Sequence, residues 1–403
     1  MNAGRVISRI LALIAIVVLQ PLLLAHAAAN WDMKSLSQTP KVYEVHTDEP
    51  DVQALYFESV PYKGNPTRVF AYYGIPAGNK LPAMVLIHGG LGTAFAEWVR
   101  MWNKRGYAAI AIDTCGVEPG VAPPGKPWDP PTRRHTDAGP ECWDASFNTT
   151  DDPVKDQWTY HAVAAAIRAN SLIRSFPQVD PSGVGVTGIS WGGYLTDIVA
   201  GVDPRFRFAV PVYGCGFLGE DSAWIPDFQR IGPAKAEKWL SLWDPSNYLP
   251  NARMPMLWVS GTNDIHYRFE QLRKSYLLPT GPRTLSIRVR MRHGQVEGTS
   301  PEEISVFADS IVKHGVSLVR IVKTKRSSVE FKAEIPVVKA ELNFTTDDGP
   351  WPDREWKTVP AQLDHEKHRA SSKIPAGARA WYFNLVDERG LVVSSEAIIV
   401  PSA

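Results

Sequence analysis

Apolar runs and helical repeats alternate along the chain from about residue 50 to about residue 315. Short continuous apolar runs are typical of strands buried in a parallel sheet, and apolar residues at helical spacing follow them. The predicted strands cover residues 52–58, 69–74, 83–87, 107–112, 183–187, 208–213, 256–259 and 285–289, and the predicted helices cover residues 94–105, 158–173, 192–202 and 301–313. The pattern predicts a mostly parallel sheet flanked by helices, with an antiparallel hairpin of the first two strands at its edge.

Two segments interrupt this alternation. Residues 116–150 contain seven prolines and no periodic apolar pattern, which predicts a long irregular loop. Such loops in compact domains are usually functional or mobile. Residues 216–248 are aromatic and polar, with a helical pattern over residues 234–242. We predict that they form a small cap inserted between two core strands.

Beyond about residue 320 the apolar period becomes that of a strand. Short predicted strands are joined by turns of Gly, Pro and Asp, and they cover residues 329–334, 337–344, 380–385 and 391–400. This composition predicts a small β-sandwich. The chain therefore divides into an α/β domain over residues 29–318 and a β-sandwich accessory domain over residues 319–403.

The first 28 residues have the pattern of a signal peptide. Arg5 and Arg9 form a basic start, residues 10–19 are an unbroken apolar run, and the small-x-small sequence A-H-A follows at residues 25–27. The alternative is an uncleaved membrane anchor, but the run is short of the roughly 20 apolar residues that a spanning helix needs. We therefore expect an exported protein, periplasmic or secreted, with no stable membrane insertion after cleavage.

Composition and charge exclude several classes of protein. The 403 residues are 44% hydrophobic and 21% charged, which is ordinary for a globular protein. The formal net charge of +1 gives no reason to expect nucleic acid as a partner. After export, three cysteines allow one disulfide and one free thiol. Cys115 follows a predicted strand and Cys142 closes the Pro-rich loop, so we pair these two and expect Cys215 to be a buried thiol.

The strongest chemical signal is the sequence G-I-S-W-G-G over residues 188–193. It follows a predicted strand and opens a predicted helix, which is the context of a nucleophile elbow. The abrupt turn exposes the Ser190 hydroxyl above the sheet, and glycines at positions 188 and 192 avoid collisions with neighbouring backbone. The alternative is a purely structural turn.

A second glycine-rich turn, H-G-G-L-G over residues 88–92, follows an earlier core strand. Such a turn lets backbone amides approach a substrate carbonyl oxygen. We predict an oxyanion hole made by the N–H of Trp191 and one from Gly90 or Leu91. His88 is interpreted as structural, because it precedes the nucleophile in the chain.

Asp264 is the candidate acid, because it directly follows a predicted core strand and comes after Ser190, in the chain order that this elbow requires. The competing carboxylates of the predicted cap are those of Asp221, Asp227 and Asp244.

His293 is the candidate general base, because it lies on the loop after the last core strand. His266 is too close to Asp264 in sequence to complete a triad. The other histidines lie at a helix end or in the β-sandwich, at His314, His365 and His368.

The chain from residue 50 to residue 315 resembles the α/β-hydrolases grouped with acetylxylan esterases, dienelactone hydrolases and prolyl-oligopeptidase-type peptidases. The resemblance is carried by H-G-G at 88–90, G-I-S-W-G-G-Y at 188–194, G-T-N-D at 261–264, H-G at 293–294, W-D-P-S-N-Y-L at 243–249 and P-E-E-I at 301–304. It implies an α/β-hydrolase fold, catalytic in its α/β domain, with Ser190, Asp264 and His293 as the triad. The last two motifs are similar to those of exported bacterial esterases with a C-terminal β domain.

The chain also departs from these relatives. Dienelactone hydrolases use a cysteine nucleophile where this chain has Ser190, and many acetylxylan esterases carry R-G-Q where this chain has T-C-G at residues 114–116. There is no room before residue 50 for the propeller of prolyl-oligopeptidase-type peptidases. Metal-binding, P-loop and dinucleotide-binding motifs are absent from the sequence, so we expect a hydrolase that needs no cofactor.

Three functions follow from these residues. The leading hypothesis is an esterase that removes a short acyl group, such as acetyl, from a small molecule or a carbohydrate through an acyl-enzyme on Ser190. Trp191, Trp224, Trp239 and Trp243 are then candidates for stacking on a sugar ring, although they could equally pack the cap. The second hypothesis is an exopeptidase whose amine pocket uses Asp221 or Asp227. The third is a non-catalytic carbohydrate-binding or adhesion protein.

Overall fold

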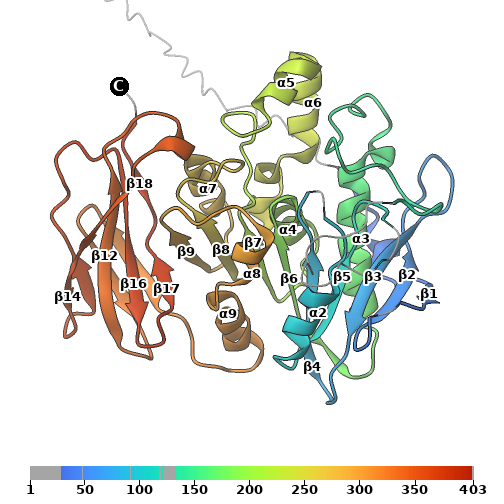
Figure 1. Cartoon of the computed structure of the whole chain (residues 1–403), viewed down its shortest axis with the longest axis horizontal. Helices are drawn as coiled ribbons and strands as arrows, with labels where there is room; N and C mark the ends of the chain where they lie inside the picture. The colour runs from blue at the N-terminus through green and yellow to red at the C-terminus, as the bar shows by residue number, and fades with distance from the viewer. Residues whose placement is uncertain (1–28, 48, 91, 118–119, 121–132, 402–403) are drawn as a thin grey trace, which may run out of the picture.

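The computed structural model describes residues 29–401 except for residues 48, 91, 118–119 and 121–132. The predicted signal peptide and residues 118–119 and 121–132 of the Pro-rich segment therefore lie outside the described residues. Figure 1 shows a large sheet with its helices at the centre and on one side, and the C-terminal antiparallel sheets on the other. Within the described residues, no helix is long and apolar enough to cross a membrane.

The central sheet has nine strands in the order β1-β2-β3-β5-β4-β6-β7-β8-β9. Its strands are β1 (Val42–Val45), β2 (Gln53–Glu58), β3 (Arg68–Gly74), β4 (Leu81–Ile87), β5 (Ala108–Ile112), β6 (Val179–Ile189), β7 (Phe208–Val212), β8 (Met256–Gly261) and β9 (Arg283–Arg288). β1, β2, β3 and β5 pair antiparallel, and the strands from β5 through β4 to β9 pair parallel. This confirms the predicted α/β-hydrolase fold class. The hairpin β2–β3 is not at the edge, however, because the short strand β1 pairs with β2 outside it.

The helices that link these strands lie on both faces of the sheet. They are α1 (Met33–Leu36), α2 (Ala96–Asn103), α3 (Trp158–Ile173), α4 (Trp191–Val202), α5 (Ile225–Ile231), α6 (Pro233–Trp243), α7 (Phe269–Tyr276), α8 (Gln295–Thr299) and α9 (Glu303–Val312), with single 3₁₀ turns at Val154–Asp156, Pro245–Asn247 and Leu249–Asn251. The chain moves from β4 to β5 in one direction and then back past β4 to β6. Because such crossovers are right-handed, α2 and α3 cover opposite faces, and the direction in which the sheet grows reverses at this point.

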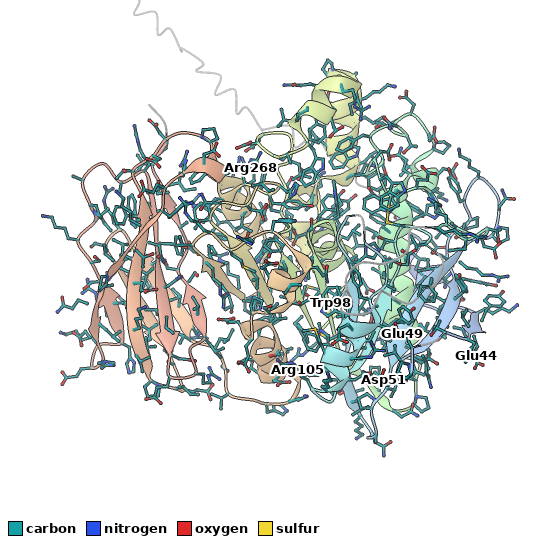
Figure 2. All side chains as sticks on the ribbon, in the orientation of Figure 1. Glu44, Glu49, Asp51, Trp98, Arg105 and Arg268 are labelled. Atoms are coloured by element: carbon teal, nitrogen blue, oxygen red, sulfur yellow. A yellow bond between two sulfur atoms is a disulfide. The ribbon has the colours of Figure 1, made fainter. Side chains whose placement is uncertain are left out.

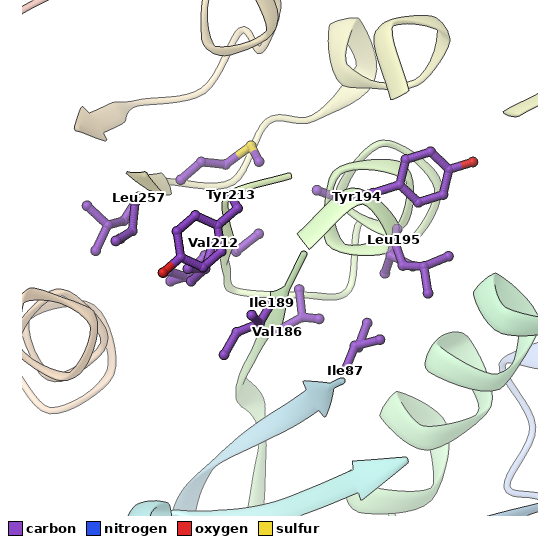
Figure 3. Close-up of a cluster of buried hydrophobic side chains, with 14 of the residues drawn as sticks. Ile87, Val186, Ile189, Tyr194, Leu195, Val212, Tyr213 and Leu257 are labelled. Carbon is purple, nitrogen blue, oxygen red and sulfur yellow. The ribbon is translucent and has the colours of Figure 1, made fainter. Parts of the chain in front are cut away.

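The carboxyl ends of the central strands rest on a dense apolar cluster. Figure 3 shows Ile87, Val186, Ile189, Val212 and Leu257 around β6, on both sides of the strand. All five side chains are at most 2% exposed. Strands buried on both faces explain the continuous apolar runs in the sequence. At the periphery, Glu49 and Asp51 lie beside α2 (Figure 2), where Arg100 pairs with both.

The C-terminal residues form two antiparallel sheets, in the orders β10-β11-β15-β14 and β13-β12-β16-β17, with β18 also paired to β16. The strands are β10 (Arg320–Lys325), β11 (Ser328–Lys332), β12 (Val337–Thr345), β13 (Lys357–Pro360), β14 (Gln362–Asp364), β15 (Arg369–Ser371), β16 (Ala380–Asp387), β17 (Val392–Ser394) and β18 (Ile398–Ile399), with a 3₁₀ turn η4 at Trp351–Asp353. β10 and β13–β15 have no clear apolar alternation and were not predicted. The predicted strand over residues 391–400 is split into β17 and β18.

The outer edge of β9 is covered by the C-terminal sheets. The backbone N–H of Ile287 donates to Ser394 Oγ at 2.8 Å, and its C=O accepts from Asn384 Nδ2 at 3.2 Å. Glu303 bridges the same junction, since it pairs with Arg288 at 2.7 Å and accepts the backbone N–H of Val392 at 2.6 Å. Side chains thus satisfy backbone groups that a free edge strand would expose.

A disulfide joins the end of β5 to the irregular segment that follows it. Cys115 and Cys142 are bonded, with their Cα atoms 5.0 Å apart, and Cys215 is a buried free thiol, both as predicted from the sequence. The described residues of the segment, 116, 117, 120 and 133–150, contain no helix and no strand beyond the isolated bridge between Val117 and Arg134. The crosslink holds Cys142 close to the end of β5.

A buried histidine on α3 makes the stability of the fold depend on pH. Burial lowers the pKa of His161 to about 4, and its Nε2 donates to the C=O of Lys155 at 2.9 Å. Because the unfolded chain takes up this proton near pH 6.5 and the folded chain does not, stability falls as pH drops from about 6.5 to about 4, by about 1.4 kcal/mol per pH unit. We expect His161→Gln, which retains a donor for Lys155, to reduce this slope in measurements of Tm against pH. Parallel curves for the two proteins would contradict the assignment.

Candidate active site

Ser190 occupies a sharp turn between β6 and α4. Its backbone has φ 59° and ψ −117°, a conformation that side chains other than glycine rarely adopt. The turn is possible because two of its residues are glycines, which have no Cβ, at positions where the neighbouring backbone leaves no space for one. A Cβ at Gly188 would lie 2.1 Å from the C=O oxygen of Gly192, and one at Gly192 would lie 2.0 Å from that of Ile87. The strained turn presents the Ser190 hydroxyl above the sheet.

His293 and Asp264 complete a continuous hydrogen-bonded chain with Ser190. His293 Nε2 lies 2.8 Å from Ser190 Oγ, and its Nδ1 lies 2.8 Å from Asp264 Oδ2. Because a carboxylate accepts from Nδ1–H, Nε2 is left to accept the serine hydroxyl. Ser190 follows β6, Asp264 follows β8 and His293 follows β9. The fold therefore brings the three residues together at the carboxyl edge of the sheet, where the sequence analysis expects them.

The Asp264 carboxylate is fixed on its other oxygen. The side chain is buried, and Oδ1 accepts the backbone N–H groups of His266 at 2.7 Å and Tyr267 at 2.9 Å. These two donors stabilise a buried charge and orient Oδ2 toward the imidazole of His293. A carboxylate held in this way is suited to orienting and stabilising an imidazolium.

The glycine turn after β4 lies against the elbow. A Cβ at Gly90 would come within 2.7 Å of Trp191 Cδ1, so the residue must be small for the two turns to meet. Trp191 begins α4, and its N–H belongs to the first turn, where helix donors have no intrahelical acceptor. Gly90 and Trp191 are thus neighbours beside Ser190, as an oxyanion hole requires. Leu91, the other predicted donor, lies outside the described residues.

His88 holds the glycine turn in place through hydrogen bonds made by its ring. It is buried, its Nδ1 donates to the C=O of Gly89 at 2.6 Å, and its Nε2 accepts the backbone N–H of Thr114 at 2.9 Å. Burial lowers the pKa of His88, which favours the neutral ring that this bonding needs. These contacts agree with the structural role that the sequence assigned to it.

Aromatic rings surround the Ser190–His293 pair. The Tyr213 ring lies 4.3 Å from the His293 ring, and the His266 ring lies 4.6 Å from it on another side. The half-buried Trp191 and Trp224 are in contact with each other, with ring centroids 4.5 Å apart. The site is therefore bordered by flat faces beside the candidate nucleophile.

Sequence reasoning missed His266 and Tyr213 as neighbours of the candidate base. His266 was set aside because of its closeness to Asp264, yet that closeness places its ring against His293. Burial and the neighbouring His293 lower the pKa of His266. Tyr213 stands where β7 ends, beside the strand of the elbow, and its hydroxyl donates to the C=O of Arg292 at 2.6 Å. The sequence feature that could have identified Tyr213 as a neighbour of the site was its position at the end of a predicted core strand.

The predicted substrate contacts of Trp239 and Trp243 are wrong. Both side chains are fully buried. The Trp239 indole donates to the C=O of Ala145 at 2.9 Å, and the Trp243 indole donates to Gln157 Oε1 at 2.7 Å. They pack α6 against the disulfide-linked segment and α3, so neither offers a face to a ligand. Trp224 alone of the predicted cap tryptophans stands beside Trp191.

The competing carboxylates have other partners. Asp221 pairs with Arg268 at 3.3 Å, and Asp227 pairs with Arg230 at 3.0 Å. Figure 2 shows Arg268 beside α7. Asp244 is buried and accepts backbone N–H groups, which include that of Leu218 at 2.8 Å.

Three residues of types that often bind metals lie close together near the candidate active site, but they do not fit a metal site. His88, Asp113 and Cys115 place their ligand atoms within 4.8 Å of one another. The Cys115 sulfur is in the disulfide, however, and the Asp113 carboxylate accepts from Thr93 Oγ1 at 2.9 Å and from the N–H of Val117 at 2.8 Å. Their ligand atoms are already used by the protein.

A cavity of about 400 Å³ lies away from this chemistry. It is lined by β9, β10 and β17, and none of the candidate catalytic residues contributes to it. This cavity is therefore separate from the candidate active site.

Comparisons with known proteins agree with the fold. The family model for acetyl xylan esterase (AXE1) matches residues 28–231, which include Ser190 but end before Asp264 and His293. Two solved structures are similar, the acetyl xylan esterase from Paenibacillus sp. R4 and acetyl xylan esterase 1 from Thermoanaerobacterium sp. JW/SL YS485. The first is 19% identical with a TM-score of 0.52 over 69% of this chain and 92% of its own. The second is 15% identical with a TM-score of 0.54 over 73% and 98%.

A curated relative, the uncharacterized peptidase YuxL of Bacillus subtilis (strain 168), is 24% identical over 211 residues. That match covers 49% of this chain and 28% of the relative, so this chain spans less than a third of the relative's length.

Proposed function

The chain belongs to the acetyl xylan esterase (AXE1) family of α/β-hydrolases, and from that premise we propose that it is a serine esterase that removes short acyl groups, with acetylated carbohydrate as the substrate class. The observation that carries the proposal is the unbroken hydrogen-bonded chain from Ser190 Oγ through His293 to Asp264. A hydroxyl, an imidazole and a buried carboxylate in this order are the parts that acyl transfer to a serine needs.

In the acylation step, Ser190 Oγ attacks the ester carbonyl carbon while His293 Nε2 takes the hydroxyl proton. The new C–O bond turns the carbonyl oxygen into an oxyanion, and we propose that it accepts hydrogen bonds from the N–H of Trp191 and from that of Gly90 or Leu91. The intermediate then collapses, the bond to the leaving alcohol breaks, and the imidazolium gives its proton to that alcohol. Asp264 holds the imidazole in the required tautomer throughout.

Deacylation repeats the same steps with water. His293 removes a proton from a water molecule that attacks the acyl carbon, and it then returns the proton to Ser190 Oγ as the acyl bond breaks. The products are a carboxylic acid and the regenerated serine.

The aromatic border supports a sugar as the alcohol part of the substrate. Trp191 and Trp224 stand in contact beside the elbow and are half-buried, so part of each ring is exposed. Flat indole faces pack well against the C–H faces of sugar rings. The family match and these two rings together make an acylated carbohydrate our proposed substrate.

An exopeptidase is the weaker alternative. Recognition of a substrate amino group needs a free carboxylate, and the two candidates, Asp221 and Asp227, are each paired with an arginine. A purely binding function is weaker still, because it gives no reason for the strained Ser190 or its alignment with His293.

We also propose that the protein works outside the cytosol. The Cys115–Cys142 disulfide supports this, because such bonds form and persist in oxidising compartments and are rare in the cytosol. The N-terminal pattern over residues 1–28 agrees with export.

The test is hydrolysis by the wild-type protein across three substrate types. We expect turnover of p-nitrophenyl acetate, a steep loss of kcat/KM for octanoyl and longer esters, and acetate release from acetylated xylan or xylose. We expect no cleavage of aminoacyl-p-nitroanilides. Folded protein that hydrolyses no short ester would overturn the proposal, and preferential anilide cleavage would replace it with the peptidase function.

A further inference from the structure

The loop that carries Asp264 is held from the C-terminal sheets. Asn263 directly precedes the acid, and its Nδ2 donates to the backbone C=O of Pro352 at 2.9 Å and of Arg354 at 2.8 Å. Both acceptors lie in or beside η4, the single turn between β12 and β13. One carboxamide therefore ties the loop between Asn263 and Phe269, which carries Asp264 and is called the acid loop below, to a segment about 90 residues further along the chain.

The direction of that carboxamide is set by a buried hydroxyl. Thr262 Oγ1 donates to Asn263 Oδ1 at 2.7 Å and accepts the backbone N–H of Arg290 at 3.0 Å. Thr262 is fully buried. Because the amide oxygen already faces Thr262, the amide NH₂ must face the carbonyl groups at η4.

The other end of the acid loop is packed against the same segment. Phe269 begins α7, and its ring lies 5.3 Å from that of Trp351, 5.0 Å from that of Trp356 and 5.9 Å from that of Tyr382. Phe269 and its three partners are each at most 6% exposed. The loop between Asn263 and Phe269 is thus clamped at both ends, and Asp264 lies within it.

The η4 segment is itself braced, so it can act as a fixed support. The Arg354 guanidinium stacks on the Trp351 ring at 3.5 Å, and its Nε donates to the C=O of Gly349 at 2.7 Å. Arg354 is 9% exposed. Removing this side chain would loosen the acceptors of Asn263 without touching the acid loop directly.

We propose that Asn263 and Arg354 are positioning residues for the triad, through which the C-terminal sheets hold Asp264 in register with His293. The inference rests on the proposed function, because it presumes that Asp264 orients the base. Neither residue touches the reacting atoms. Their effect arises because a catalytic group displaced by about 1 Å loses up to about 100-fold in rate. The C-terminal sheets are then part of the catalytic apparatus rather than a separate binding module.

The test compares Asn263→Leu and Arg354→Met with wild type on p-nitrophenyl acetate, well below the Tm of each protein. We expect kcat to fall about 10-fold or more in each variant while KM changes less than about 2-fold, because orientation rather than substrate binding is lost. Since both residues act through one contact, the double variant should lose little more than the worse single variant.

Arg283→Met is the matched control. It removes an exposed ion pair to Glu396 that also links β9 to the C-terminal sheets, but that pair does not contact the acid loop. We expect its kcat to equal that of wild type. Wild-type kcat in folded Asn263→Leu and Arg354→Met, a change confined to KM, or an equal loss in Arg283→Met would each overturn the inference. Inactive wild type would instead overturn the proposed function.

Discussion

Ser190→Ala is expected to lower kcat for p-nitrophenyl acetate by about 10⁵-fold or more and to abolish covalent labelling by a fluorophosphonate probe. The reason is that, among the described residues, Ser190 Oγ is the hydroxyl hydrogen-bonded to His293 Nε2, at 2.8 Å. Alanine cannot form the acyl-enzyme, so only the polar surroundings could still favour attack by water. Initial rates and in-gel fluorescence measure the two effects.

The Tm of Ser190→Ala shows whether this variant keeps the wild-type fold. Ser190 has a positive φ, and alanine at this position keeps the Cβ that serine already has, so the Tm should change little. Labelling of Ser190→Ala at the wild-type rate would show that another residue is the nucleophile. Loss of labelling together with loss of the folded state would call for Ser190→Cys, which keeps a side chain that can react.

Asp264→Asn is expected to lower kcat by about 10⁴-fold while the fold is retained. Asp264 Oδ1 accepts two backbone N–H groups, so the asparagine oxygen should stay there and its NH₂ should face His293 Nδ1. The NH₂ group can only donate, so Nδ1 must accept and the ring proton moves to Nε2. The Ser190 hydroxyl then has no base to accept its proton.

The measurement is kcat and KM on the same ester, with Asp227→Asn as the control. Asp227 is an acidic residue of the segment between β7 and β8 that pairs with Arg230, so its substitution should leave kcat unchanged. If Asp264→Asn kept more than about a tenth of wild-type kcat, Asp264 would not be the orienting acid.

The sequence was sufficient to predict the strands of the central sheet that are buried on both faces. Strands such as β4 and β5 appear as unbroken apolar runs, because helices cover both faces of the sheet. β1 was missed, since it is a four-residue edge strand whose side chains are half-exposed or exposed. The strands β13–β15 were missed for a related reason, because three or four residues are too few to establish a period.

The same limit applies to the site. Ser190, Asp264 and His293 could be placed because each follows a core strand, and the ends of parallel strands meet at one edge. Whether a tryptophan packs or faces solvent depends on tertiary contacts, and so the sequence could not separate Trp224 from Trp239. The link from Asn263 to η4 was beyond reach for another reason, because its acceptors are backbone carbonyl groups and any sequence can supply those.

The covered edge of β9 has a consequence for how this chain can be divided. A chain ending after α9 would strip Ile287 of its partners Ser394 and Asn384 and leave an open strand beside the loop that carries His293. Open edges recruit other strands, so such a fragment would tend to self-associate. Dividing the chain at this point would therefore require compensating substitutions along the exposed edge of β9.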